Sequence, residues 1–193
     1  ERDYFEFTEC EKLNPVWEPP NQHTYIFNNN CKGDKERIPG IDILVNDKET
    51  WTYKNFEAKI IHIPGHTTGH IAFYFFNEKI IFTGDTLFSL GCGKIFEGTY
   101  KEMFESLSKI KNLPEDTKIY CGHEYTFQNS KFCIEHDPQN QDLQKKITKI
   151  NEKLKNNVPT IPSILKDEKE CNIFLRAKNV ESFSKLRDLK DNF

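Results

Sequence analysis

The stretch Ile63-Pro-Gly-His-Thr-Thr-Gly-His70 follows an apolar run and sets a histidine directly behind a glycine. Two later segments repeat this order of apolar run, glycine and metal-binding type of residue, namely Ile81-Phe-Thr-Gly-Asp-Thr86 and Ile119-Tyr-Cys-Gly-His-Glu-Tyr125. Each glycine allows the backbone to turn tightly. In open α/β sheets, ligands gather beyond the carboxyl ends of the strands. We therefore expect His66, Asp85 and His123 to converge at one edge of a sheet.

Imidazole and carboxylate groups are ligands that suit zinc, iron or manganese, and a carboxylate can bridge two such ions about 3.5–4 Å apart. The alternative is that each side chain is a hydrogen-bonded partner at a strand end, but the threefold repetition favours a metal site. His70 lies four residues after His66 and is expected to orient the site rather than bind metal. His62 and His136 are expected to be structural.

The segments around these residues predict a βαβ-like layer. Four β-rich runs are continuously apolar, which predicts strands buried on both faces: 59–63, 71–76, 79–83 and 118–121. Between the last two runs, Thr99 and Glu102 have the spacing of a capping box. The helix that they begin has an apolar face formed by Met103, Phe104, Leu107 and Ile110. Pro114 is expected to end it.

The flanking regions differ in character. Residues 1–56 are rich in Asn, Pro and charge, with short strands expected at Tyr25–Phe27 and Ile41–Val45 and a hairpin from the latter onto Trp51–Tyr53. His23 is expected to be a solvated loop histidine. After Tyr125 the chain reads as helical. A helix is expected to start at Asp137-Pro138, a loop at Val158–Pro162, and a last amphipathic helix to carry Phe183, Leu186 and Leu189.

Composition narrows the class of protein. The net charge of −3 argues against a nucleic-acid-binding surface, and no apolar run approaches the roughly 20 residues of a membrane span. The six cysteines form no C-x-x-C pair, which speaks against a zinc ribbon and favours reduced thiols inside a cell. The chain begins with Glu1, so we expect a processed product or a fragment, cytoplasmic or from an organelle if a targeting segment was removed.

The three quoted segments and the stretch 91–98 carry a family resemblance. Pro64-Gly-His-Thr-Thr-Gly-His70 resembles the third metal motif of the metallo-β-lactamase superfamily, and Thr83-Gly-Asp-Thr-Leu-Phe88 resembles its bridging-aspartate motif. Gly91-Cys-Gly-Lys-Ile-Phe-Glu-Gly98 and Tyr120-Cys-Gly-His-Glu-Tyr-Thr126 narrow the likeness to glyoxalase II, the hydroxyacylglutathione hydrolases. The resemblance implies an α/β fold, the metallo-β-lactamase-like αββα sandwich with its amino-terminal half missing. Residues 1–126 would form this partial domain and residues 127–193 a helical glutathione-binding region.

The resemblance also implies a site. Two divalent ions, zinc in the first place with iron or manganese as alternatives, would be held by His66 on one side and His123 on the other, with Asp85 as the catalytic bridging ligand. Further positions would contact the glutathione part of the substrate: Lys94, His123 through its backbone, Tyr125, Arg187 and Lys190. Taken alone, the two basic residues of the last helix would read as a solvated face. Phe96 stands where the family has tyrosine, which predicts weaker binding of glutathione.

The family's Thr-His-x-His-x-Asp-His motif has no match in residues 1–65. We therefore expect this chain alone to be inactive, and its parent to be a monomeric thioester hydrolase that converts S-lactoylglutathione to lactate and glutathione in methylglyoxal detoxification. The alternatives are a persulfide dioxygenase of the same fold and a non-catalytic fragment or pseudo-enzyme that binds glutathione or a partner.

Overall fold

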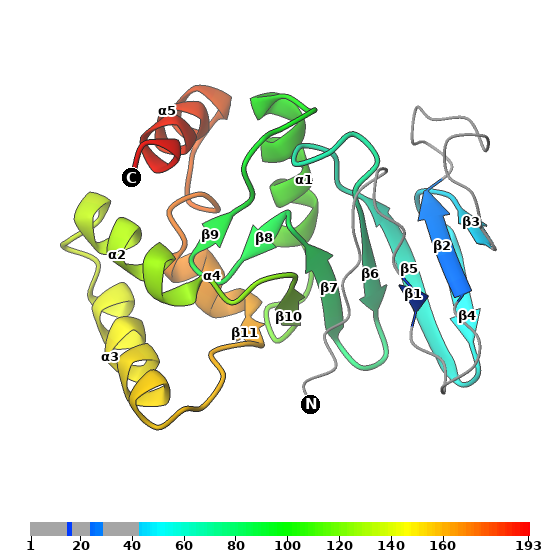
Figure 1. Cartoon of the computed structure of the whole chain (residues 1–193), viewed down its shortest axis with the longest axis horizontal. Coiled ribbons are helices and arrows are strands. Elements are labelled where there is room, and N and C mark those ends of the chain that lie inside the picture. The colour runs from blue at the N-terminus through cyan, green and yellow to red at the C-terminus, as the bar shows by residue number, and fades with distance from the viewer. Residues whose placement is uncertain (1–14, 17–23, 29–42) are drawn as a thin grey trace.

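The computed structural model describes residues 15–16, 24–28 and 43–193 (Figure 1). A six-stranded sheet has the order β11-β10-β7-β6-β5-β4. Its strands are β4 (Thr50–Tyr53), β5 (Phe56–His62), β6 (Ile71–Phe75), β7 (Ile80–Gly84), β10 (Lys118–Cys121) and β11 (Ser163–Ile164). β7 and β10 are parallel, and the other neighbours are antiparallel. β5, β7 and β10 therefore run in one direction, and β5 and β7 end at the upper edge of the sheet in Figure 1.

Two smaller sheets accompany the main one. β1 (Pro15–Val16), β2 (Thr24–Asn28) and β3 (Ile43–Val45) form one, and β8 (Leu87–Phe88) with β9 (Gly91–Cys92) forms a hairpin. The predicted hairpin of β3 onto β4 was wrong, because β4 pairs with β5 and β3 pairs with β2. The chain does turn after Asn46, but the residues that follow bond to Ile60 of β5. His23 and residues 41–42 of the expected strand lie outside the described residues.

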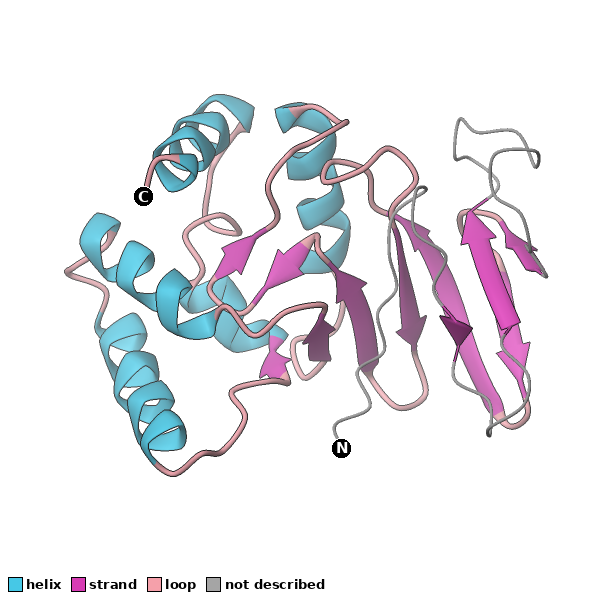
Figure 2. Ribbon diagram, in the orientation of Figure 1, coloured by secondary structure: helices cyan, strands magenta, loops and turns pink. Residues whose placement is uncertain are grey.

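The helices are α1 (Tyr100–Lys111), α2 (Thr126–His136), α3 (Gln141–Lys155), α4 (Leu165–Cys171) and α5 (Val180–Asp191). The predicted capping box of α1 is confirmed, since Thr99 and Glu102 exchange both bonds. The predicted start of α3 was wrong by a few residues, because Asn140 is the cap and Asp137 ends α2. Figure 2 shows α2, α3 and α5 gathered at one end of the molecule and β1–β3 at the other.

The main core lies between the sheet and the helices, and a smaller cluster lies on the other face. β6 contributes to both, since Ala72 and Tyr74 enter the main core whereas Ile71 and Phe73 enter the smaller cluster. The prediction of burial on both faces is thus confirmed for β6. In β5, Lys59 is exposed, but Ile60 enters the smaller cluster and Ile61 packs against the main core, so this strand is buried on both faces over part of its length.

The helical region is joined to the sheet rather than merely packed on it. β11 lies beyond residue 126 and extends the sheet beside β10. Leu165 and Lys166 donate backbone bonds to Thr117 and Glu115, which precede β10. Within the part of the chain that the structure describes, no helix is long and apolar enough to cross a membrane.

Candidate functional site

The three residues predicted to converge lie together at the carboxyl edge of the sheet. Asp85 directly follows β7, His123 follows β10 by one residue, and His66 follows β5 by three. The Oδ2 atom of Asp85 lies 3.3 Å from Nε2 of His123 and 3.7 Å from Nε2 of His66. His66 is buried, whereas the side chain of His123 is 42% exposed. The site is therefore open to solvent on the His123 side.

The glycines before these residues have two different roles. Gly65 and Gly84 have positive φ angles of 146° and 48°, which L side chains rarely adopt, so they make the expected tight turns. Gly122 has no such angle. A Cβ there would lie 2.5 Å from Oδ1 of Asp85, so the absence of a side chain leaves room for the carboxylate.

His66 is oriented by a backbone carbonyl. Its Nδ1 lies 2.6 Å from the carbonyl oxygen of Lys94. Because a carbonyl oxygen can only accept, Nδ1 carries the proton and donates it. In the neutral form of the ring, this contact leaves Nε2 unprotonated and facing Asp85, which is the form that binds a metal ion.

His70 lies behind Asp85 and is buried. Its Nε2 is 3.2 Å from both the carbonyl oxygen of Thr83 and the amide nitrogen of Asp85, and its buried Nδ1 has no partner among the described residues. When Nε2 is protonated it can donate to the carbonyl of Thr83, and when it is unprotonated it can accept from the amide of Asp85, so the two hydrogen bonds cannot form at the same time. Burial, with a smaller contribution from His66, lowers the pKa of His70 to about 4. His70 thus contacts the backbone of Asp85 as a neutral ring.

Aromatic rings surround the two imidazoles. The ring of Tyr125 stacks on His123 with centroids 5.0 Å apart, and Phe88 meets Tyr125 edge-on. Phe96 is 66% exposed and lies 5.0 Å from the ring of His66. These rings give the site an apolar rim, in which Phe96 and Tyr125 are exposed and Phe88 is buried.

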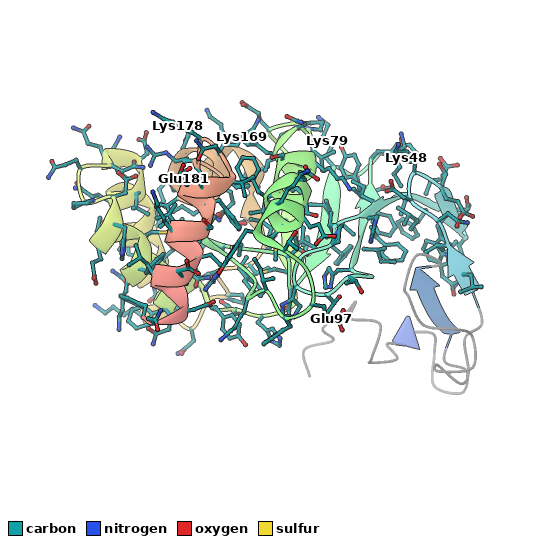
Figure 3. All side chains as sticks on the ribbon, turned by 90° about the horizontal axis from the view of Figure 1, so that it is seen from above. Lys48, Lys79, Glu97, Lys169, Lys178 and Glu181 are labelled. Atoms are coloured by element: carbon teal, nitrogen blue, oxygen red, sulfur yellow. The ribbon has the colours of Figure 1, made fainter. Side chains whose placement is uncertain are left out.

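A pair of hydrogen bonds connects the loop that follows His66 with the loop that follows Lys94. Oε2 of Glu97 accepts bonds from the backbone amide and the hydroxyl of Thr68, at 2.9 and 3.1 Å. Figure 3 shows Glu97 on the side of the molecule opposite Lys79 and Lys169. The segment after His66 is therefore held against the segment after Lys94.

The donor atoms fit a divalent metal in kind. Two ligands of a tetrahedral zinc ion with bonds of about 2.1 Å are about 3.4 Å apart, and the two imidazole–carboxylate separations of 3.3 and 3.7 Å lie near that value. Residues 43–193 nevertheless contain no group of three or more His, Cys, Asp or Glu placed to hold one ion. Each ion would have one imidazole and a share of the Asp85 carboxylate, so the described residues form an incomplete set of ligands for two ions.

The residues predicted to contact glutathione differ in exposure. Lys94 is exposed and Tyr125 is 50% exposed, so both can meet a ligand. Lys190 is partly exposed, with Nζ about 5 Å from the ring centroids of Phe132 and Phe193. Burial, followed by the nearby guanidinium of Arg187, lowers the pKa of Lys190. Arg187 itself is buried, and its guanidinium is bound to backbone carbonyls.

The histidines expected to be structural have local partners. His62 contacts the carbonyl oxygen of Thr68 through Nε2 at 2.8 Å, and His136 contacts that of Phe132 through Nδ1 at 3.0 Å. Neither contact involves the three converging residues.

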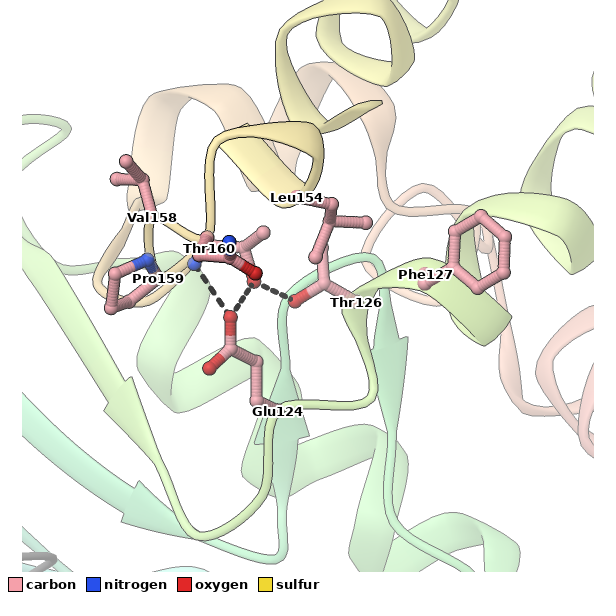
Figure 4. A pocket seen from close by; sticks show the side chains of 8 residues that line it. Glu124, Thr126, Phe127, Leu154, Val158, Pro159 and Thr160 are labelled. Atoms are coloured by element: carbon pink, nitrogen blue, oxygen red, sulfur yellow. Dashed lines mark hydrogen bonds between the residues drawn. The ribbon is translucent and has the colours of Figure 1, made fainter. Parts of the chain in front are cut away.

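A cavity of about 290 Å³ lies beside the site, lined by residues of the α2 amino terminus and the 154–160 segment (Figure 4). In it, Oε1 of Glu124 accepts bonds from the amide and hydroxyl of Thr160, at 2.6 and 2.7 Å. Glu124 follows His123, so this contact fixes the turn that carries His123. No local pattern predicts this contact, because the partners are 36 residues apart.

Comparison with known proteins divides the chain in two. Residues 11–123 match the model of the metallo-β-lactamase superfamily, and residues 124–193 match the model of the hydroxyacylglutathione hydrolase C-terminus. The chain is 71% identical over 162 residues to a hydroxyacylglutathione hydrolase of Pelagibacter ubique (strain HTCC1062), covering 84% of the chain and 68% of the relative. It is 50% identical over 159 residues to one of Prochlorococcus marinus (strain MIT 9301), covering 82% and 65%. The chain thus spans about two thirds of the length of these relatives.

Solved structures share the fold. ETHE1 from Myxococcus xanthus has a TM-score of 0.60 at 19% identity, covering 86% of this chain and 57% of its own. A metallo-β-lactamase from Staphylococcus aureus has a TM-score of 0.61 at 22% identity, covering 85% and 45%. The predicted metallo-β-lactamase-like fold is confirmed. At these identities, the likeness concerns the fold alone.

Proposed function

The chain belongs to the hydroxyacylglutathione hydrolases, thioester hydrolases of the metallo-β-lactamase superfamily, and we propose that at the full length of its relatives it hydrolyses S-(2-hydroxyacyl)glutathione. The substrate would be S-lactoylglutathione and the products lactate and glutathione, which is a step of methylglyoxal detoxification. The observation that carries the proposal is the placement of the Asp85 carboxylate between the Nε2 atoms of His66 and His123.

Two divalent ions, with zinc favoured by the imidazole ligands, would be held by His66 and His123 with Asp85 between them. When bound, such ions supply hydroxide at neutral pH by lowering the pKa of coordinated water to about 7. The protein's own part is to keep the donor atoms in place. The carbonyl of Lys94 holds His66 in the required tautomer, and His70 contacts the backbone of Asp85. The leaving group is a thiolate, whose ordinary pKa of about 8.5 makes a strong general acid unnecessary.

Glutathione would be recognised at the open rim. Lys94 and Lys190 offer cations for its two carboxylates, and Tyr125 offers a ring and a hydroxyl beside His123. The backbone at His123 would complete the contact. Arg187 belonged to the predicted recognition set, but its guanidinium is directed at backbone carbonyls, which supports a different role for it.

Two alternatives have weaker support. A persulfide dioxygenase would share the fold, but the likeness to ETHE1 rests on 19% identity, against 71% to a protein named as the hydrolase. A non-catalytic binding protein draws support from the incomplete ligand set in residues 43–193. We propose a reducing compartment such as the cytoplasm, where cysteines stay as thiols. We propose a monomer there.

The test is hydrolysis of S-lactoylglutathione by protein of the relatives' full length, with bound metal measured on the same sample. We expect turnover that Asp85→Ala removes together with the metal, and that His136→Ala leaves unchanged. The 193-residue chain alone should show little or no turnover. Full activity in Asp85→Ala would refute the proposed site, and metal-containing protein that binds glutathione without turnover would favour the non-catalytic alternative.

A further inference from the structure

The turn formed by residues 88–94 is held by buried polar side chains from three helices. This site turn receives bonds at almost every residue. Asn129 of α2 donates to the carbonyl of Ser89, and Glu168 of α4 accepts from the amide of Leu90, at 3.1 and 2.7 Å. Asn172, at the end of α4, donates to the carbonyl of Gly91 at 3.1 Å, and Arg187 of α5 donates to that of Cys92 at 2.8 Å.

Arg187 binds the end of the site turn that is nearest to the imidazole. Its Nη1 is 2.8 Å from the carbonyl oxygen of Cys92 and 3.5 Å from that of Gly93. The next carbonyl, of Lys94, is the one that accepts the hydrogen bond from His66 Nδ1. The guanidinium is therefore one residue away from the group that sets the tautomer and orientation of His66.

The guanidinium is itself held in one position. Its Nη2 donates to Oδ1 of Asp191 at 2.9 Å, one helical turn further along α5, and its carbon lies 5.3 Å from the ring centroid of Phe174. Arg187 is only 4% exposed. The planar fork of donors suits two neighbouring carbonyls and a carboxylate together, which a single ammonium group cannot match.

On the side that faces His66 and Asp85, the site turn is closely packed. A Cβ on Gly93 would lie 1.8 Å from the backbone oxygen of Asp85 and 3.3 Å from Nδ1 of His66. The amide of Gly93 also donates to the carbonyl of Thr86 at 3.2 Å. A displacement of the turn therefore reaches both His66 and Asp85.

We propose that Arg187 is a positioning residue that orients His66 through the backbone of Cys92–Lys94, while Glu168, Asn172 and Asn129 fix the first half of the same turn. This deepens the proposed function, because the effect on metal binding rests on the role of His66 as a ligand. It also separates Arg187 from Lys190, whose ammonium lies over two aromatic rings. The carboxy-terminal helices thereby set the geometry of a site that lies on the sheet.

The direct test is the ¹⁵N spectrum of the His66 ring in the full-length, metal-free protein, at a pH about two units above the ordinary imidazole pKa of 6.5. The wild-type protein should show the Nδ1–H form. Arg187→Met should shift the His66 ring signals or average them between tautomers, whereas Lys190→Met, a cation removed from the same helix, should leave them in place. An Nε2–H form in the wild type, or unchanged signals in a folded Arg187→Met protein, would overturn the proposal.

Asn172→Ala loosens the site turn from α4 and keeps the proposal testable if Arg187→Met does not fold. It should move the same His66 signals, and unchanged signals in folded Asn172→Ala protein would also count against the proposal. Zinc titrated into the metal-free protein supplies the second readout. A lost supporting contact weakens metal binding by about 10- to 100-fold, and we expect this loss for Arg187→Met but not for Lys190→Met. If the His66 signals move while zinc affinity holds, Arg187 still positions His66, and the proposed metal role of His66 fails instead.

Discussion

Gly122→Ala tests how little room the Asp85 carboxylate has. The added Cβ would lie 2.5 Å from Oδ1 of Asp85, about 0.9 Å closer than the shortest ordinary contact of 3.4 Å. The backbone of Gly84 is also near, at 3.5 Å, so the carboxylate is the group that must move. A rotation that relieves the contact changes the distances of 3.3 and 3.7 Å from Oδ2 to the two imidazoles.

A misplacement of about 1 Å near reacting groups can cost about 100-fold in rate, or about 2.7 kcal/mol of transition-state stabilisation. We expect Gly122→Ala to lower kcat/KM for S-lactoylglutathione by about that factor and to weaken metal binding. Its thermal midpoint should change little, because Gly122 is half-buried and the closest group is the end of a side chain that can rotate. Asp85→Ala sets the lower limit of activity on the same assay. Wild-type activity in Gly122→Ala protein, or a crystal structure with both distances preserved, would refute the reasoning.

Three further predictions concern the rim and its support. Lys190→Ala should raise KM roughly fivefold with little change in kcat, and the effect should fade in high salt, because a partly exposed cation binds ground and transition states alike. Phe96→Tyr should lower KM by about two- to tenfold, since one neutral hydrogen bond contributes about 0.5–1.5 kcal/mol. His70 has a folded-state pKa of about 4, below its unfolded value of 6.5. The free energy of unfolding should therefore fall by about 3 kcal/mol as pH drops from 6.5 to 4, measured by urea titration.

Each of these has a result that contradicts it. An equal loss of kcat in Lys190→Ala would mean that the lysine acts on the chemistry rather than on binding. An unchanged KM in Phe96→Tyr would mean that no substrate group reaches the new hydroxyl. His70→Gln should remove the part of the pH dependence of the unfolding free energy that comes from the imidazole. If the unfolding free energy of that variant falls just as steeply between pH 6.5 and 4, other groups cause the dependence.

The converging residues could be predicted because each signal is local. A strand, a glycine and a ligand within eight residues place His66, Asp85 and His123 at strand ends, and the common direction of β5, β7 and β10 brings those ends together. Gly122 has a second role that the local pattern does not predict, since a Cβ there would meet the side chain of Asp85, which follows another strand. Strand pairing was equally hard to predict near the amino terminus. The apolar pattern of residues 43–53 suits a hairpin, but β4 finds β5 through the two-residue turn at Lys54 and Asn55.

The supporting contacts could not be read from local pattern, because the partners are far apart in the chain. Glu168 and Leu90 are separated by 78 residues, and Glu124 and Thr160 by 36. In the sequence, nothing distinguishes the buried Glu168 from the other charged residues of α4. Its burial becomes understandable only with Lys146, Ser89 and the amide of Leu90 around it, since a buried charge requires such partners.

Arg187 is the instructive case, because a local signal for its burial was present. It lies four residues after Phe183, which is fully buried, so it follows the apolar face of α5. It also lies three residues before Lys190, and this spacing equally predicts a shared basic face. Burial decides between the two, since a cation on the buried face must find acceptors or destabilise the fold. The carbonyls of Cys92 and Gly93 are those acceptors, and they connect the last helix of the chain to the ring of His66.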